Sequence, residues 1–131
     1  MDYRIFISHS WTYSDQYERL VHILNNNGFF FYNHSVPKDD PVHTNGTQIQ
    51  LREAITNHIR GTQCVLILAG VYSSYSKWIN EEIQIAQSMG KPIIAIEPWG
   101  AERTSVVVKL AANKIVGWNG PSIIRAIQSL C

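Results

Sequence analysis

The stretch CVLILAGVYSSYSKWINEEIQIAQSMGKPIIAIE, residues 64–97, decides the fold because it reads as a strand, a helix and a second strand. Its first part, Cys64 to Ala69, is wholly apolar, as expected of a central parallel strand that is covered on both faces. Residues 75–90 repeat apolar side chains at helical spacing, and Pro92 to Ile96 forms the next apolar run. A helix between two buried strands predicts a right-handed crossover within a parallel sheet.

The same alternation of strand and helix extends in both directions from this unit. The expected strands are Tyr3 to Ser8, Phe29 to Asn33, Cys64 to Ala69, Pro92 to Ile96 and Lys114 to Trp118. The expected helices run from Ser14 or Asp15 to Asn27 and Gly28, from a Thr47 cap to Ile59, across residues 75–90, from Glu102 to Ala112 and from Pro121 to Leu130. Five strands alternating with five helices predict an α/β fold with a doubly wound five-stranded parallel sheet and helices on both faces.

Length and composition predict one globular domain over residues 1–131. With 45% hydrophobic and 16% charged residues, the chain has enough apolar material for a single core and is too short for a second. Its formal net charge of +1 gives no broad attraction to nucleic acid or to an acidic membrane surface. No apolar run approaches the ~20 residues that cross a bilayer, so we expect no membrane segment.

The start of the chain and its cysteines indicate a cytoplasmic protein. The opening MDYRIFISHS has a polar residue at every second or third position and lacks the long apolar core of a signal peptide. Cys64 lies inside an apolar run, and Cys131 is the last residue of the sequence. We therefore expect no disulfide and a reducing compartment.

Glu82 lies where an amphipathic helix should be apolar. At 3.6 residues per turn, one row of this helix holds Trp78, Glu82, Ile85 and Met89, and the row beside it holds Ile79, Ile83 and Ala86. Glu81 falls on the polar face instead. An ionised carboxylate that faces the core is costly unless it is paired, protonated or next to a cavity. Two interpretations stay open: a partly solvated first-turn Glu stabilised by the helix dipole, or a functional group above a crevice in the sheet.

The architecture also predicts which residues meet a ligand. In open α/β sheets the ligand lies beyond the carboxyl ends of the strands, near the point where the strand order reverses. The segments expected there are residues 8–14, 34–46, 70–77 and 97–102, and Glu82 should hang over the same crevice. Their polar and aromatic side chains are typical of a small-molecule pocket and comprise Ser8, His9, Ser10, Trp11, Asp39, Asp40, Ser73, Ser74, Ser76 and Trp78.

Simpler roles stay open for several of these residues. Trp78 can pack in the core, Ser8 can end its strand, and Ser76 can cap the helix that follows. His9 has no identified partner and fits a surface position as well as an acid–base role. His34, His43, Asp39 and Asp40 do not have the spacing of a known ligand set, so we predict no metal site.

Two other doubly wound folds lack their signature residues in this chain. A response-regulator receiver needs acidic residues after the first strand, where this chain has Ser8, His9 and Ser10. A dinucleotide-binding Rossmann domain carries G-x-G-x-x-G at the same place, whereas the first glycine of this chain is Gly28. Neither function is expected.

Two motifs resemble Toll/interleukin-1 receptor (TIR) domains. RIFISHSW, residues 4–11, is similar to the opening strand and loop of that family, and S-x-W-x-x-x-E, residues 76–82, is similar to the loop and helix after its third strand. The resemblance covers essentially the whole chain and is nearest to the small prokaryotic TIR-like proteins, including the signal-producing component of Thoeris antiphage defence. The long loop SVPKDDPVHTNG, residues 35–46, lacks the R-D-x-x-P-G pattern of the animal adaptors, which favours an enzyme.

The resemblance implies a flavodoxin-like fold and cleavage of the nicotinamide N-glycosidic bond of NAD⁺. Glu82, four residues after Trp78, occupies the place of the family's catalytic residue. The implied substrate-binding residues are Phe6, Ser8, His9, Ser10, Trp11, Asp40, Ser74, Ser76 and Trp78. NAD⁺ is expected as the substrate, without a cofactor. The product is ADP-ribose or a cyclic isomer, depending on which nucleophile reaches the ribose carbon.

Two other functions remain alternatives at this point. One is a non-catalytic module that works by assembly of TIR domains, and the other is a nucleotide-binding sensor without turnover. The Trp78 and Glu82 pair favours the enzyme. For either class we expect self-association through TIR surfaces, and a separate effector protein as a possible partner.

Overall fold

The computed structural model describes residues 3–8, 14–34, 48–68, 77–97 and 106–131 of the chain. Within these ranges the strands are β1 (Arg4–Ser8), β2 (Tyr32–Asn33), β3 (Cys64–Leu68), β4 (Ile93–Glu97) and β5 (Lys114–Gly117). The helices are α1 (Ser14–Asn26), α3 (Gln48–Arg60), α4 (Lys77–Ser88), α5 (Val106–Ala111) and α6 (Gly120–Leu130). The predicted alternation of strand and helix is confirmed.

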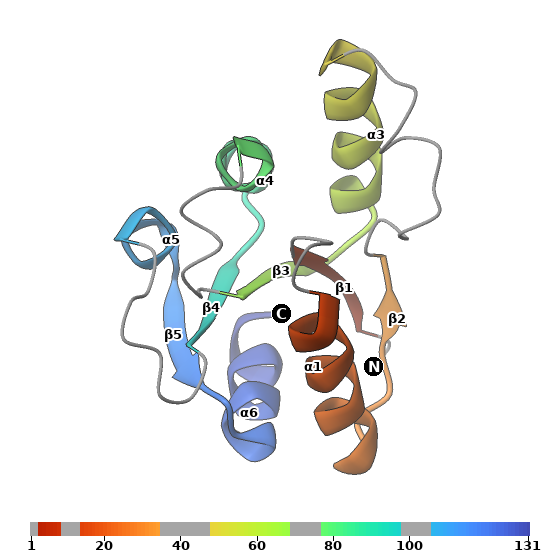
Figure 1. The fold of residues 1–131 in the computed structure, drawn as a ribbon, viewed down its shortest axis with the longest axis vertical. Coiled ribbons are helices and arrows are strands. Elements are labelled where there is room, and N and C mark those ends of the chain that lie inside the picture. Colours follow the sequence, from red (N-terminus) through yellow and green to blue (C-terminus); the bar gives the residue numbers. More distant parts are fainter. Residues whose placement is uncertain (1–2, 9–13, 35–47, 69–76, 98–105) are drawn as a thin grey trace.

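All five strands form one parallel sheet in the order β2-β1-β3-β4-β5 (Figure 1). This is the strand order of the flavodoxin-like doubly wound fold, so the predicted fold class is correct. The chain steps outward from β1 to β2 and then returns past β1 to β3. The order therefore reverses between β1 and β3, where Ser8 pairs with Ile67 at the carboxyl ends of both strands.

The helices cover the two faces of the sheet as separate layers (Figure 1). Residues of α1 and α6 pack on one face in a core cluster that includes Leu20, Leu24, Ile123 and Ile127. Residues of α3, α4 and α5 pack on the other face, in a second cluster that includes Ile55, Ile59, Ile83 and Val108. Alternate β1 residues enter the two clusters, with Ile5 and Ile7 in the first and Phe6 in the second.

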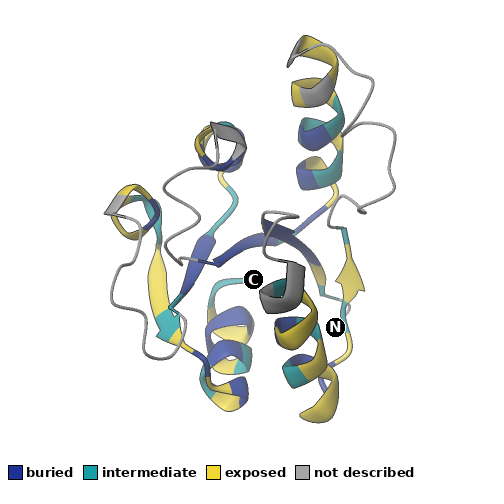
Figure 2. Cartoon of the chain, in the orientation of Figure 1, coloured by how far each residue is buried: buried dark blue, intermediate teal, exposed yellow. Residues whose placement is uncertain are grey.

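Burial falls from the centre of the sheet to its edges (Figure 2). All five residues of β3 are buried, whereas both residues of the edge strand β2 are exposed. This matches the apolar sequence of β3, which has helices on both faces. Within the described ranges, no helix has the length and apolar character needed to cross a bilayer.

β2 is shorter than the predicted strand Phe29 to Asn33. The N–H of Phe29 bonds the carbonyl of Leu24 at 3.0 Å, and that of Gly28 bonds Asn25 at 3.0 Å, so both residues complete the end of α1. Gly28 has φ +70°, the left-handed conformation that such helix ends require. The ladder with β1 therefore begins only at Tyr32, whose N–H bonds the Tyr3 carbonyl at 2.7 Å.

Cys64 and Cys131 form a disulfide, with S–S 2.07 Å and Cα atoms 5.6 Å apart. The expectation that the chain has no disulfide is wrong. Cys64 begins β3, and the end of α6 returns to this part of the sheet, so both cysteines join the same core cluster (Figure 1). The two cysteines are 67 residues apart along the chain, so no local sequence pattern predicted their contact. Because disulfides are typical of oxidising compartments, cysteine usage no longer argues for a reducing one.

Replacement of Cys131 by Ser should destabilise the protein by about 4 kcal/mol, the chain-entropy value for a closed loop of this length. Cys131 is the better site for this change because Cys64 is fully buried. Urea unfolding of the oxidised protein, compared with Cys131→Ser, measures the difference. As a control, a thiol reductant should lower the stability of the wild type and leave that of Cys131→Ser unchanged. Equal stability of the oxidised wild type and the variant would contradict the prediction.

Candidate functional site

Glu82 is buried because it lies on the face of α4 that packs against the sheet. Ile79, Ile83 and Ala86 are buried in the cluster shared with α3 and α5. Glu82 lies among these positions and is only 8% exposed. The helical rows therefore predicted its burial correctly. A carboxyl is thus held below the surface by the packing of its neighbours.

The Ser8 hydroxyl donates a hydrogen bond to Oε2 of Glu82. Ser8 is the last residue of β1 and is 1% exposed, so the bond is buried. The two residues lie 74 positions apart in the sequence. They meet at the carboxyl end of β1, beside the reversal of strand order, which is where open α/β sheets bind ligands.

Burial raises the pKa of Glu82 to about 7, and the hydrogen bond from Ser8 opposes that rise. Loss of hydration penalises the charged form, whereas a donor to the carboxylate favours it. Burial is the larger of the two causes. The carboxyl therefore changes its charge near neutral pH, a property that is concentrated at functional sites.

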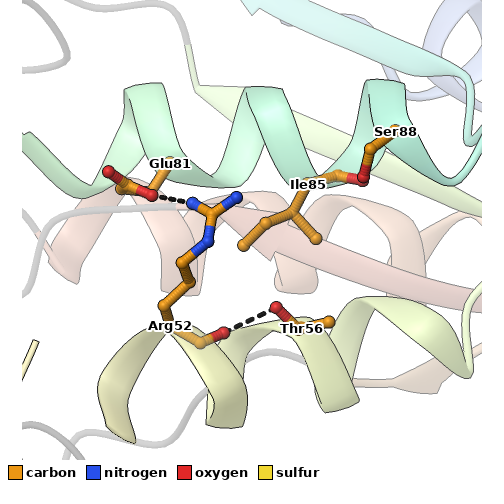
Figure 3. A network of polar contacts seen from close by, with 5 residues as sticks. All are labelled: Arg52, Thr56, Glu81, Ile85 and Ser88. Carbon is orange, nitrogen blue, oxygen red and sulfur yellow. Dashed lines mark hydrogen bonds and ion pairs between the residues drawn. The ribbon is translucent and has the colours of Figure 1, made fainter. Parts of the chain in front are cut away.

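Glu81 has a different environment from its neighbour. Its carboxylate forms an ion pair with Arg52 of α3, as Figure 3 shows. The side chains of Arg52 and Glu81 are 45% and 38% exposed, so solvent screens the pair and its contribution to stability is small. Nothing in the sequence pattern points to Arg52, because its partner lies on another helix. Glu81 thus belongs to an ion pair at the surface, whereas its neighbour Glu82 lies in a buried site.

The remaining predicted site residues divide into two groups. Phe6 is 1% exposed and packs in the cluster of α3, α4 and α5, on the side of the sheet that holds Glu82. Trp78 lies in the first turn of α4, but its side chain falls outside the described part of the chain. Also outside the described residues are His9, Ser10, Trp11, Asp39, Asp40, Ser73, Ser74 and Ser76. Their binding roles stay predictions.

The described polar groups of this site are the carboxyl of Glu82 and the hydroxyl of Ser8. In its ionised form the carboxylate can stabilise positive charge that develops on a bound molecule, an effect that low dielectric strengthens. In its protonated form it can donate a proton. Among the described residues no cluster of three or more His, Cys, Asp or Glu side chains could hold a metal ion.

A family model described as "Thoeris protein ThsB, TIR-like domain" matches residues 6–103. The match includes the last three residues of β1, the long loop, β3 and all of α4, and therefore both Ser8 and Glu82. Among curated proteins, none matches the chain significantly.

Two solved structures share the fold at low sequence identity. A CMP N-glycosidase from Clostridium botulinum, BcmB, superposes with TM-score 0.55 and 17% identity over 97% of each chain. A prokaryotic SEFIR domain superposes with TM-score 0.52 and 17% identity, over 98% of this chain and 95% of that one. At this level of sequence identity, the two structures show a shared fold and nothing more.

Glu82→Gln should stabilise the folded protein at pH 8 relative to the wild type. Because the folded-state pKa of Glu82 is about 7, the folded protein binds more protons than the unfolded chain between about pH 4.5 and pH 7. Stability therefore falls as pH rises through this window, by up to about 3 kcal/mol. Gln does not ionise and escapes this loss.

Urea unfolding at several pH values between 4 and 8 measures the difference. The advantage of Glu82→Gln should grow with pH and level off above pH 7. Glu81→Gln is the matched control and should keep the pH dependence of the wild type, since Glu81 is half-exposed. Parallel stability curves for Glu82→Gln and the wild type would show that the carboxyl is not buried at an energetic cost.

Proposed function

The chain belongs to the family of Thoeris ThsB TIR-like domains, and from this membership and the buried Glu82 we propose that it cleaves the nicotinamide N-glycosidic bond of NAD⁺. The observation that carries the proposal is the position of Glu82. Its carboxyl is buried at the carboxyl edge of the sheet and has a pKa of about 7. The structural neighbour from Clostridium botulinum supports the proposal. It has the same fold, and its name, CMP N-glycosidase, describes an enzyme that cleaves an N-glycosidic bond.

The chemistry of NAD⁺ suits a site with one carboxylate. When the bond between C1′ and the pyridinium nitrogen breaks, its electron pair neutralises the ring and nicotinamide leaves as a neutral molecule. No general acid is needed. The ribose becomes oxocarbenium-like, and ionised Glu82 stabilises that positive charge. Water then adds at C1′ and loses a proton to give ADP-ribose, or another nucleophilic atom of the same molecule attacks C1′ and loses its proton to give a cyclic isomer.

The other predicted residues supply substrate binding in this proposal. Trp11 or Trp78 stacks on a ring of the dinucleotide, and Ser10 and Ser76 bind ribose or phosphate oxygens. Phe6, His9, Asp40 and Ser74 are the other predicted binding residues, and Ser8, the ninth of the set, is hydrogen-bonded to Glu82. NAD⁺ is the substrate, and the reaction requires neither a cofactor nor a metal.

Glu82→Gln should lower the turnover of NAD⁺ by at least about a hundredfold, because a neutral amide cannot stabilise the developing positive charge. Chromatography of the reaction mixture gives the loss of NAD⁺ and the appearance of nicotinamide, ADP-ribose or a cyclic product. Circular dichroism establishes that the variant is folded.

Glu81→Gln is the matched control for this experiment and should keep most of the activity, since Glu81 pairs with Arg52 at the surface. Equal loss in both variants would overturn the assignment of Glu82. A folded wild type that releases no nicotinamide at any concentration would instead favour the alternative of a non-catalytic assembly module.

In the cell, this activity would serve antiphage defence, with a separate effector protein that receives the product. Control would come from self-association. The surface of α5 supports that part of the proposal, because Val107 and Leu110 are 52% and 82% exposed while Val108 between them is buried. Exposed apolar side chains of this kind mark contact surfaces when they are adjacent.

Turnover per molecule should rise with protein concentration, because a partner surface would increase the fraction of molecules in the competent conformation. Activity and molecular mass, measured over the same concentration range, test this together. Leu110→Glu should weaken both the association and the concentration dependence, while Gln128→Glu, an exposed change on α6, should weaken neither. A flat specific activity in a protein that stays monomeric would argue for a self-sufficient enzyme.

A further inference from the structure

Ser8 is a neutral hydrogen-bond donor to a buried carboxylate, and this combination defines a role for it. A hydroxyl has a single O–H, and in Ser8 that proton is directed at Oε2 of Glu82. Ser8 is also 1% exposed. It therefore cannot donate to a substrate while it holds Glu82.

Both partners of this hydrogen bond lie on rigid elements. Ser8 is held by the ladder between β1 and β3, where it pairs with Ile67. Glu82 is held by α4, whose residues Ile79 and Ile83 are 2% and 5% exposed. The Ser side chain is short, so its oxygen has little freedom once the strand is in place. The bond thus fixes a carboxyl that would otherwise rotate about three side-chain torsions.

Two described cations on the helices that pack beside α4 have partners other than Glu82. On α3, Arg52 forms its ion pair with Glu81. On α5, Lys109 lies 3.9 Å from Glu97 of β4. Neither cation contributes to the pKa of Glu82, for which burial and the Ser8 hydrogen bond are the causes. Among the described residues, Glu82 is therefore oriented by a neutral group and keeps its negative charge uncompensated.

We propose that Ser8 is a positioning residue that acts through Glu82: its hydroxyl fixes the carboxylate and supports its charged form without neutralising it. A lysine or arginine in the same place would also orient the carboxylate, but it would cancel the charge that a cationic substrate or transition state needs. The role of Ser8 in turnover rests on the proposed function. Its effect on the Glu82 carboxyl does not.

The first experiment measures the ionisation of Glu82 without any substrate. In protein with ¹³C-labelled glutamate carboxyls, the Glu82 resonance is assigned by its absence from Glu82→Gln and titrated by NMR. Removal of a hydrogen bond to the charged form should raise the midpoint in Ser8→Ala by about one to two pH units. Ser8→Thr keeps the hydroxyl and should return the midpoint to that of the wild type.

The matched control is Thr62→Val, which removes another buried hydroxyl whose hydrogen bond goes to the Ile59 carbonyl at 2.7 Å. This variant should lose stability and keep the midpoint of Glu82. If Ser8→Ala does not fold, Ser8→Cys replaces it, because the thiol is of similar size and a weak donor. A midpoint that is the same in the wild type and in the Ser8 variant that lacks the hydroxyl would overturn the proposal.

The second experiment measures turnover of NAD⁺ as a function of pH. Activity should rise with pH as Glu82 ionises, and Ser8→Ala should displace this rise to higher pH by the shift that NMR records. A lower kcat with an unchanged KM supports positioning. A raised KM with an unchanged pH profile would instead make Ser8 a substrate contact and overturn the proposal.

The two experiments separate the two proposals. If the wild type does not cleave NAD⁺ but its Glu82 midpoint still depends on Ser8, the proposed function fails and the coupling between Ser8 and Glu82 stands. If NAD⁺ is cleaved and the titration midpoint of Glu82 does not depend on Ser8, the proposed function stands and the proposed role of Ser8 fails.

Discussion

The packing of α4 against the sheet is the constraint on which the candidate site depends. Ile79, Ile83 and Ala86 must be buried for the helix to dock, and Glu82 lies within the same face. The carboxyl is therefore taken out of water as a consequence of packing that the fold requires. Ser8 then meets it from β1. Any change that tilts or rotates α4 would alter the burial of this carboxyl and its hydrogen bond together.

The burial of Glu82, which the proposed function requires, lowers the stability of the folded protein. A buried carboxylate without a cationic partner destabilises the folded state whenever it is ionised. The fold tolerates this because the centre of the sheet is fully apolar and packed on both faces. The Cys64 and Cys131 disulfide adds stability on the face opposite to Glu82, through the cluster of α1 and α6. Stabilising interactions and the destabilised carboxyl thus lie on different sides of the sheet.

The same arrangement explains why adjacent glutamates differ so strongly in chemical character. One helical step of 100° moves a side chain from the apolar face to the polar one. Glu81 of α4 forms an ion pair with Arg52 of α3 (Figure 3) at the surface, where solvent screens both charges. Glu82 points to the sheet and meets a neutral hydroxyl. Only the second environment strengthens electrostatic effects on a bound molecule, because only there is water excluded.

The sequence by itself determined the type and order of the elements, the burial of β3 and the direction in which Glu82 faces. Each of these follows from periodicity and turn chemistry within a short stretch, such as Gly28 at the end of α1. Tertiary structure alone decided the contacts of Ser8 with Glu82, of Arg52 with Glu81 and of Cys64 with Cys131. These pairs depend on which strands are neighbours and on how far each helix is displaced along the sheet. Neither quantity is encoded in a local pattern, so the sequence placed Ser8 and Glu82 at the same edge of the sheet but did not predict the hydrogen bond between them.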